Sequence, residues 1–170
     1  FFQLQEEMRS AFESTVLDLP RHMLIQYPHL VHDAHVAVVC ANLTLAATRD
    51  TIRVLAWLKS NAPQTKVVVV ANGVPSGGAL EISRRDFEQS IERPVDIVFP
   101  FDPKVAAQSA KLGKPMVEVA GSKMASNFNS LSSLVLDNSS DDSGRGDSDG
   151  GETKSSKSLV DHFKSMLAKK

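Results

Sequence analysis

The amino-acid sequence predicts an α/β protein with three layers, in which a mostly parallel sheet carries helices on both faces. Three short runs are apolar on successive residues, as strands covered on both faces are, and they occupy residues 35–40, 66–72 and 95–100. Segments with a helical spacing of apolar residues separate these runs. This alternation is typical of a parallel sheet with right-handed crossovers. The 170 residues, 42% of them apolar, are enough for one domain.

The predicted elements begin with a helix over residues 2–12, whose apolar side chains share one face and which we expect to pack on the sheet. Residues 15–19 have the sequence Thr-Val-Leu-Asp-Leu, which favours a strand. Pro20 ends this run because proline has no amide hydrogen for a ladder. We therefore expect Asp18 near the carboxyl end of a strand. The stretch 21–33 has a mixed pattern.

The run 35–40 is apolar on both faces and is predicted to form a buried, parallel strand. A helix follows it and extends through Ser60. Asn42 or Thr44 can cap the first turn of this helix, and Pro63 lies just beyond its last turn.

The second half of the domain continues the alternation, and its strongest β signal lies in the valine-rich run 66–72, which is predicted to be a central strand. The other expected elements are a turn-rich segment over 73–78, a helix over 84–91 that Ser83 begins, a strand over 95–100, and a helix over 104–112 that Gly113 ends.

The composition changes sharply after residue 136. Residues 137–158 consist mainly of Ser, Gly and Asp, a composition that buries too little apolar surface to offset the entropy of ordering, so we expect a disordered linker. Residues 159–170 regain apolar side chains at helical spacing and are predicted to form a short amphipathic tail helix. The folded domain is thus expected over residues 1–136.

Charge and cysteine content exclude several protein classes. Nineteen basic and twenty acidic side chains leave a formal net charge of −1, so no overall field favours nucleic acid or an acidic membrane. A single cysteine cannot form an internal disulfide, and the chain shows no leader, which together predict a cytoplasmic protein. Its apolar runs are far shorter than the roughly 20 residues of a membrane span.

Candidate site residues follow the predicted strands. Ligands of an open parallel sheet bind beyond the carboxyl ends of the strands, where this sequence places Asp18, Asn72, Pro100 and Asp102. A carboxylate there can hold the water shell of Mg²⁺ or orient water, and an asparagine amide matches the edge of a base. The same residues are ordinary turn formers, and the sequence leaves both interpretations open. No G-x-x-x-x-G-K-[ST] phosphate loop occurs.

The histidines and the cysteine indicate packing rather than chemistry. No cysteine or acidic cluster completes a set of four metal ligands around His22, His29, His32 and His35, so we expect solvated or packed rings. Cys40 falls within an apolar strand, where a thiol is expected to be structural.

Four motifs, taken in order along the chain, resemble one protein family. They are Leu17-Asp18-Leu19-Pro20-Arg21, Leu45-Ala-Ala-Thr-Arg49-Asp50-Thr51, Val70-Ala-Asn72, and Phe99-Pro-Phe-Asp-Pro103 with Ala107-Gln-Ser-Ala-Lys-Leu-Gly113-Lys-Pro115. Together they resemble the CpaE/TadZ pilus-assembly ATPases, deviant Walker A relatives of MinD and ParA. The resemblance covers residues 2–136 and the C-terminal part of that ATPase domain. It implies a P-loop NTPase-like fold whose N-terminal part is missing here.

The resemblance also implies roles for single residues and a cofactor, ATP with Mg²⁺. Asp18 matches the acidic residue that supports magnesium or water, and Asn72 matches the asparagine that reads adenine. Pro100 and Asp102 match the loop that lines the adenine pocket.

Partners and location are implied in the same way. Arg49 and Asp50 match a motif near the partner face. The family forms homodimers around ATP and localises the secretion machine of the Flp pilus (type IVb, tight adherence). We therefore expect contact with the pilus secretion ATPase and other assembly proteins, no specific nucleic acid, and a location at a cell pole, near the inner membrane through partners.

Three functions remain open at this stage. Without the Walker A loop these residues alone are not expected to hydrolyse ATP, which favours a scaffold and localisation factor. A parent protein with an upstream phosphate loop would instead be a slow ATPase. The alternative is a ParA/MinD-like ATPase in DNA segregation or cell positioning, and its DNA-segregating form predicts salt-sensitive binding to DNA.

Overall fold

The computed structural model describes residues 2–77 and 80–136, and the predicted linker (137–158) and tail (159–170) lie outside them. In chain order its elements are α1 (Phe2–Ala11), α2 (Arg21–Gln26), α3 (His29–His32), β1 (Val36–Ala41), α4 (Leu45–Asn61), β2 (Lys66–Val74), α5 (Arg84–Ile91), β3 (Ile97–Pro100), α6 (Pro103–Leu112), α7 (Met116–Val119) and α8 (Ser122–Leu136).

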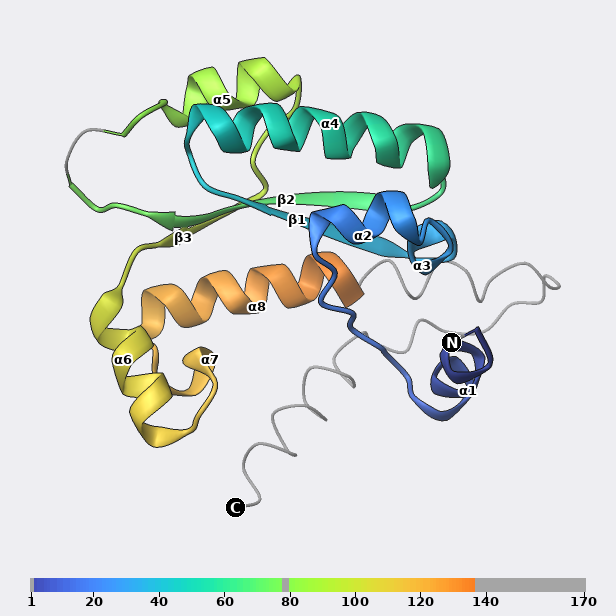
Figure 1. Cartoon of the computed structure of the whole chain (residues 1–170). Coiled ribbons are helices and arrows are strands. Elements are labelled where there is room, and N and C mark those ends of the chain that lie inside the picture. Colours follow the sequence, from blue (N-terminus) through green and yellow to red (C-terminus); the bar gives the residue numbers. More distant parts are fainter. Residues whose placement is uncertain (1, 78–79, 137–170) are drawn as a thin grey trace, which may run out of the picture.

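The three strands form a parallel sheet in the order β1-β2-β3, so the valine-rich run is the central strand. Helices α4 and α5 lie on one face of this sheet, and α8 crosses the other (Figure 1). The three-layer α/β fold predicted from the sequence is therefore confirmed. Side chains of the strands alternate between the two faces and so contribute to separate apolar cores.

The two cores draw on opposite faces of β2. On the side of α4 and α5, Val69 and Ala71 pack around Phe87, which is fully buried. On the side of α8, Val68 and Val70 join a second cluster. Since successive residues of the central strand are buried on both faces, its continuous apolar sequence has a direct structural cause.

Local side chains set where the helices begin. Thr44, rather than Asn42, caps α4: its hydroxyl accepts a hydrogen bond from the amide of Ala47 at 3.1 Å. Ser83 caps α5 in the same way. Gly113 ends α6 in the left-handed conformation, with φ 61°, which glycine adopts at little cost.

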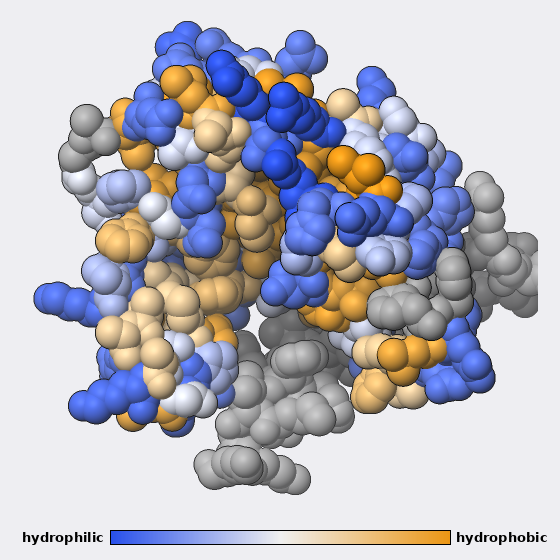
Figure 2. Space-filling model, viewed as in Figure 1, coloured by the Kyte–Doolittle hydropathy of each residue, from blue (hydrophilic) through white to orange (hydrophobic). Residues whose placement is uncertain are grey.

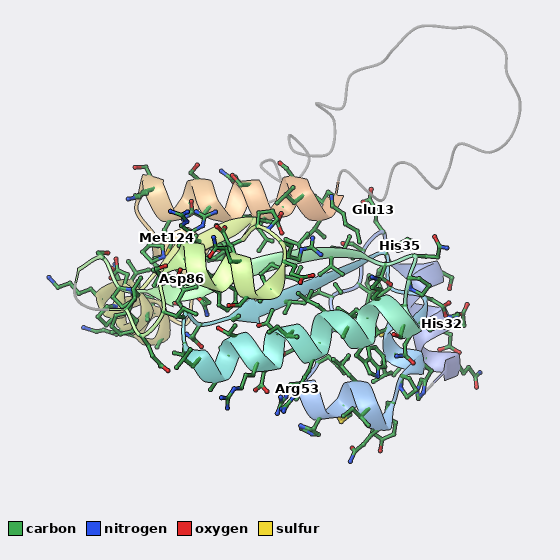
Figure 3. The ribbon with its side chains drawn as sticks, turned by 90° about the horizontal axis from the view of Figure 1, so that it is seen from above. Glu13, His32, His35, Arg53, Asp86 and Met124 are labelled. Carbon is green, nitrogen blue, oxygen red and sulfur yellow. The ribbon has the colours of Figure 1, made fainter. Side chains whose placement is uncertain are left out.

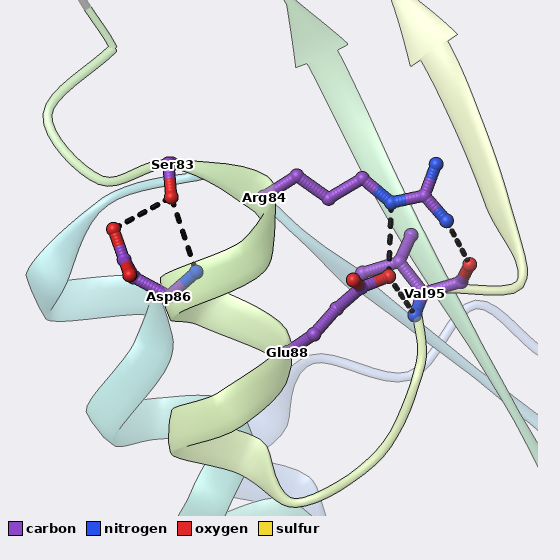
Figure 4. A network of polar contacts seen from close by, with 5 residues as sticks. All are labelled: Ser83, Arg84, Asp86, Glu88 and Val95. Carbon is purple, nitrogen blue, oxygen red and sulfur yellow. Dashed lines mark hydrogen bonds and ion pairs between the residues drawn. The ribbon is translucent and has the colours of Figure 1, made fainter.

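A polar network joins α5 to Val95, in the segment just before β3 (Figure 4). Glu88 accepts hydrogen bonds from the backbone amide of Val95 at 2.8 Å and from Nε of Arg84 at 2.9 Å. Arg84 also donates to the carbonyl of Val95 at 2.8 Å. The amide of Val95 and the side chain of Arg84 both stabilise the carboxylate, so the pKa of Glu88 is lowered from its ordinary value.

This lowered pKa predicts a defined pH dependence of stability. The charged form of Glu88 is favoured by folding, so its contribution is present above its ordinary pKa of 4.5 and is lost as the pH falls through the folded value. We expect Glu88→Gln to destabilise the domain at neutral pH and to reduce the loss of stability between about pH 5 and pH 3. Urea unfolding at a series of pH values measures this; parallel curves for both proteins would contradict the prediction.

Two N-terminal predictions need correction. The helix over residues 2–12 is confirmed as α1, but it lies away from the sheet instead of packing on it, and Leu4 is exposed (Figure 1). Residues 15–19 form no strand. Val16 is 90% exposed, and in the described part of the chain no backbone hydrogen bond joins this run to the sheet. A strand needs such a ladder and a covered face, which β propensity does not provide.

The burial predicted for β1 is also only partly correct. The strand is parallel, but it lies at an edge, with Val38 39% exposed and Cys40 exposed. Helix α8 packs mainly against β3 and β2; on this face of β1 it covers Val36 but leaves Val38 and Cys40 exposed. The sequence analysis assigned no element between residues 113 and 136, where the structure has α7 and α8.

Candidate functional site

The carboxyl ends of the strands meet at one edge of the sheet, as the sequence predicted for Asn72 and Pro100. Asn42, just beyond β1, donates a hydrogen bond from Nδ2 to the carbonyl of Asn72 at 3.0 Å. The amide of Phe101 donates to the carbonyl of Val74 at 2.8 Å. These two contacts tie the ends of β1, β2 and β3 together.

A cavity of about 340 Å³ opens at this edge. Pro100 and Asp102, both expected to line an adenine pocket, are among its walls. The complete lining is Ser76, Pro100, Phe101, Asp102, Val105, Gly121, Ser122, Lys123 and Met124. It combines residues after β2, the β3–α6 turn and the start of α8, where Figure 3 shows Met124. Its volume lies in the range of small-ligand sites.

The turn after β3 is held rigid by Asp102. Its Oδ1 accepts hydrogen bonds from the amides of Lys104 at 3.1 Å and Val105 at 3.0 Å, which makes it the N-cap of α6. Pro103 occupies the first helical position, where its missing amide hydrogen is not needed. The carboxylate therefore orders the turn that presents Pro100 and Phe101 to the cavity.

Asn72 lies beside this cavity rather than in its lining. The ladder between β2 and β3 is irregular between Ala71 and Val74, and Gly73 there has φ 65°, a left-handed value that favours glycine. Asn72 is exposed at this irregularity. Its side-chain amide is thus available to a ligand at the same sheet edge.

Asp18 is exposed and lies outside the cavity, in the segment before α2. Its carboxylate is close enough to Cys40 to influence the thiol. Desolvation by surrounding atoms raises the pKa of Cys40, and the negative charge of Asp18 raises it further. Because Cys40 is next to the last residue of β1, Asp18 lies toward the carboxyl end of that strand.

This proximity predicts how Cys40 reacts. The thiolate is the nucleophile, so a raised pKa slows alkylation at moderately alkaline pH. Asp18→Asn removes the repelling charge, and we expect the pH profile of Cys40 alkylation by iodoacetamide to move to lower pH. Mass spectrometry follows the reaction at the one cysteine, and Glu13→Gln, the same charge change at an exposed residue nearby in sequence, is the control. An unchanged profile for Asp18→Asn would show that the two groups are not neighbours.

The two residues assigned to a partner face lie on α4 and differ in their surroundings. Asp50 forms an ion pair with Arg21 at the start of α2, and Arg53 lies 3.6 Å from the same oxygen. Figure 3 shows Arg53 between α4 and α2. Arg49 is exposed. Asp50 thus joins two helices of its own chain, and Arg49 is the member of the pair that faces solvent.

Neither a group of metal ligands nor a membrane-spanning helix is found among the described residues. Within 2–77 and 80–136 no three His, Cys, Asp or Glu side chains are grouped so that they could hold a metal ion. No helix in the same ranges combines the length and apolar character needed to cross a membrane.

Sequence reasoning missed most of the cavity. Phe101 lies in the Phe99-Pro-Phe-Asp-Pro103 motif, and its aromatic ring next to two predicted site residues was an available signal. Met124, Phe128, Leu131 and Leu134 recur at helical spacing and could have revealed α8. No local signal places Ser76 and Lys123 beside β3, because both reach it only through folding.

Comparison with known proteins supports the fold. No protein-family model and no curated protein matches the sequence. Among solved structures, the MinD cell division protein of Aquifex aeolicus aligns with 78% of this chain at a TM-score of 0.61 and 18% sequence identity. The chain spans 58% of that MinD chain. The likeness shows a MinD-like α/β fold.

Proposed function

We propose that this chain supplies the adenine side of a nucleotide site in a ParA/MinD-type ATPase domain. The observation that supports this most directly is the cavity at the carboxyl edge, bounded by Pro100, Phe101 and Asp102 in a MinD-like sheet. Parallel α/β sheets bind ligands at this edge. The sequence motifs that contain these residues resemble those of the same ATPase class.

The chemistry of the lining suits a flat heterocycle. Phe101 and Pro100 offer apolar surfaces on which a base ring can stack, and Phe101 is 61% exposed before any ligand binds. The amide of Asn72 has both a donor and an acceptor, which adenine requires along one edge. Lys123 adds a positive charge to the cavity wall.

The residues fit the base better than they fit the phosphates. The 170 residues hold no G-x-x-x-x-G-K-[ST] loop, and Asp18 offers one carboxylate, whereas Mg²⁺ prefers an octahedral set of oxygens. ATP with Mg²⁺ is therefore proposed as the ligand of the whole domain. The described residues contribute recognition of adenine, and no hydrolytic step is assigned to them.

A nucleotide titration tests this assignment. We expect the chain to bind AMP and ATP with similar, low affinities, because the adenine is the part it contacts. UMP is expected to bind less tightly than either. Isothermal titration calorimetry or the fluorescence of a labelled nucleotide measures these constants. Equal binding of all nucleotides, or no binding at millimolar concentration, would refute an adenine site.

In the cell, we propose a role of the CpaE/TadZ type: a homodimeric scaffold that places the Flp pilus secretion machinery at a cell pole. The four ordered motifs support it, including the solvent-facing Arg49 and the neighbouring Asp50. Cosedimentation with a Flp secretion ATPase tests the partner, and analytical ultracentrifugation with and without ATP tests the dimer.

The alternative, a ParA/MinD-like ATPase in DNA segregation or cell positioning, draws support from the MinD-like fold. Its DNA-segregating form predicts binding to non-specific DNA that weakens steeply with salt. Binding to DNA at low salt without binding to the secretion ATPase would favour it over the pilus role.

A further inference from the structure

Asn42 lies where strand β1 has ended while β2 continues. The regular register of the two strands ends at the pair Ala41↔Ala71. The amide of Lys66 donates toward the β1 side, and alternate residues of a strand point their backbone groups to the same side, so the carbonyl of Asn72 also points toward β1. Nδ2 of Asn42 donates to this carbonyl at 3.0 Å. The side chain of Asn42 therefore adds one hydrogen bond beyond the end of the ladder.

The backbone around Asn42 is fixed by its own contacts. Its neighbours Ala41 and Leu43 are buried in the core on the side of α4 and α5. The carbonyl of Asn42 accepts a hydrogen bond from the amide of Thr44 at 3.0 Å, and Thr44 is the N-cap of α4. A side chain that is anchored to packed elements keeps a more precise geometry than one on a loose loop. Asn42 thus links Asn72 to the rigid part of the sheet.

Asn72, by contrast, lies where β2 departs from regular pairing. Between Ala71 and Val74, three residue steps along β2 match two along β3, so β2 has one extra residue there. Such a bulge redirects side chains and interrupts the ladder. A Cβ atom on Gly73, within this bulge, would lie 3.5 Å from Nδ2 of Asn42. The amide of Asn42 therefore contacts the bulge and supports it from the β1 side.

The direction of the Asn72 amide matters for the choice of base. Val68 and Val70 face the α8 core, and continued alternation places Asn72 on the same face. The cavity opens on this face, since its wall includes Met124 of α8. Figure 2 shows apolar surface over the middle of the sheet, between the helices above it and α8 below. Apolar surface holds many flat rings, so discrimination among bases depends on directed polar groups.

We propose that Asn42 is a positioning residue of the adenine site. Through its hydrogen bond to the carbonyl of Asn72, it holds the Asn72 amide in the direction that the exocyclic amino group of adenine requires. This inference rests on the proposed adenine site and adds to it a residue that does not touch the base. Asn42 therefore sets which base is preferred.

The preference for AMP over purine riboside 5′-monophosphate, which lacks the exocyclic amino group, tests this role. We expect the unchanged full chain to prefer AMP by about fivefold or more in isothermal titration calorimetry. Asn42→Asp keeps the shape of the side chain but removes the donor, and it is expected to lose most of this preference. Both nucleotides carry the same phosphate, so the ratio of their affinities cancels the effect of the added charge. Asn42→Ala, which adds no charge, is expected to give the same loss.

Asn127→Asp is the matched control. Asn127 also donates from Nδ2 to a strand carbonyl, that of Val98 at 2.9 Å, so the same change removes an equivalent hydrogen bond from a different strand. Circular dichroism checks that each variant is folded. We expect Asn127→Asp to keep the preference for AMP. Equal loss in the two aspartate variants would indicate general loosening of the sheet and would overturn the positioning role.

A double-mutant cycle separates action through Asn72 from direct contact with the base. In the Asn72→Ala background, we expect Asn42→Asp to change the preference no further. A further loss in that background, a preference that survives Asn42→Asp alone, or equal binding of both purines by the unchanged chain would overturn the positioning role. Failure of the unchanged chain to bind AMP, or to prefer it to UMP, would instead refute the adenine site, and the positioning role with it.

Discussion

Replacing Phe87 with alanine is expected to destabilise the domain by about 3–5 kcal/mol, the range for deleting a buried aromatic ring. Phe87 is 0% exposed and lies where α5 meets the sheet, among Val69, Ala71 and Ile91. No neighbour can move far enough to fill the space, because the strand residues are held by ladders on both sides of β2. Such a loss is a large share of the usual stability of a domain.

Urea unfolding followed by circular dichroism measures this change. The variant Phe101→Ala removes the same ring from a position that is 61% exposed, so it is the control and is expected to unfold close to the unchanged protein. A loss at Phe87 no larger than that at Phe101 would contradict the two-core packing described above.

The second large effect concerns binding. Phe101→Ala is expected to weaken the affinity for adenine nucleotides about tenfold or more, because stacking on an aromatic ring contributes about 1–3 kcal/mol per base. The ring lines the cavity and is largely exposed, so binding is lost without unfolding. AMP titration of folded protein, checked by circular dichroism, measures the change.

Phe12→Ala is the matched control for this experiment. Phe12 is also 61% exposed, but it follows α1, far from the turn that leads into α6 (Figure 1). We expect it to bind AMP as the unchanged protein does. Equal loss in both variants would indicate non-specific binding to exposed aromatic rings, and no loss in either would remove Phe101 from the site.

The fold was largely predictable because its signals are local. Consecutive valines in β2 indicate a strand buried on both faces, and Ser83 and Gly113 mark helix ends that the structure confirms. The prediction for residues 15–19 was wrong for the opposite reason: their composition favours a strand, but pairing depends on what lies beside them. The exposure of β1 could not be predicted either, since it depends on the path of α8.

The candidate site was predictable in part. The sequence alone placed Asn72, Pro100 and Asp102 at strand ends, and parallel topology brought those ends to one edge. It could not show that Asp102 would use its Oδ1 to cap α6, or that Asp50 would pair with Arg21 from another helix.

The sequence by itself determined the α/β class, the central position of β2 and four of the eight described helices, α1, α4, α5 and α6, because each depends on spacing within a short stretch of chain. Tertiary structure alone decided which strand face stays uncovered and which residues complete the cavity. Ser76 and Lys123 reach Pro100 from distant parts of the chain. Such contacts depend on how layers pack, and packing joins residues whose separation in sequence carries no periodic signal.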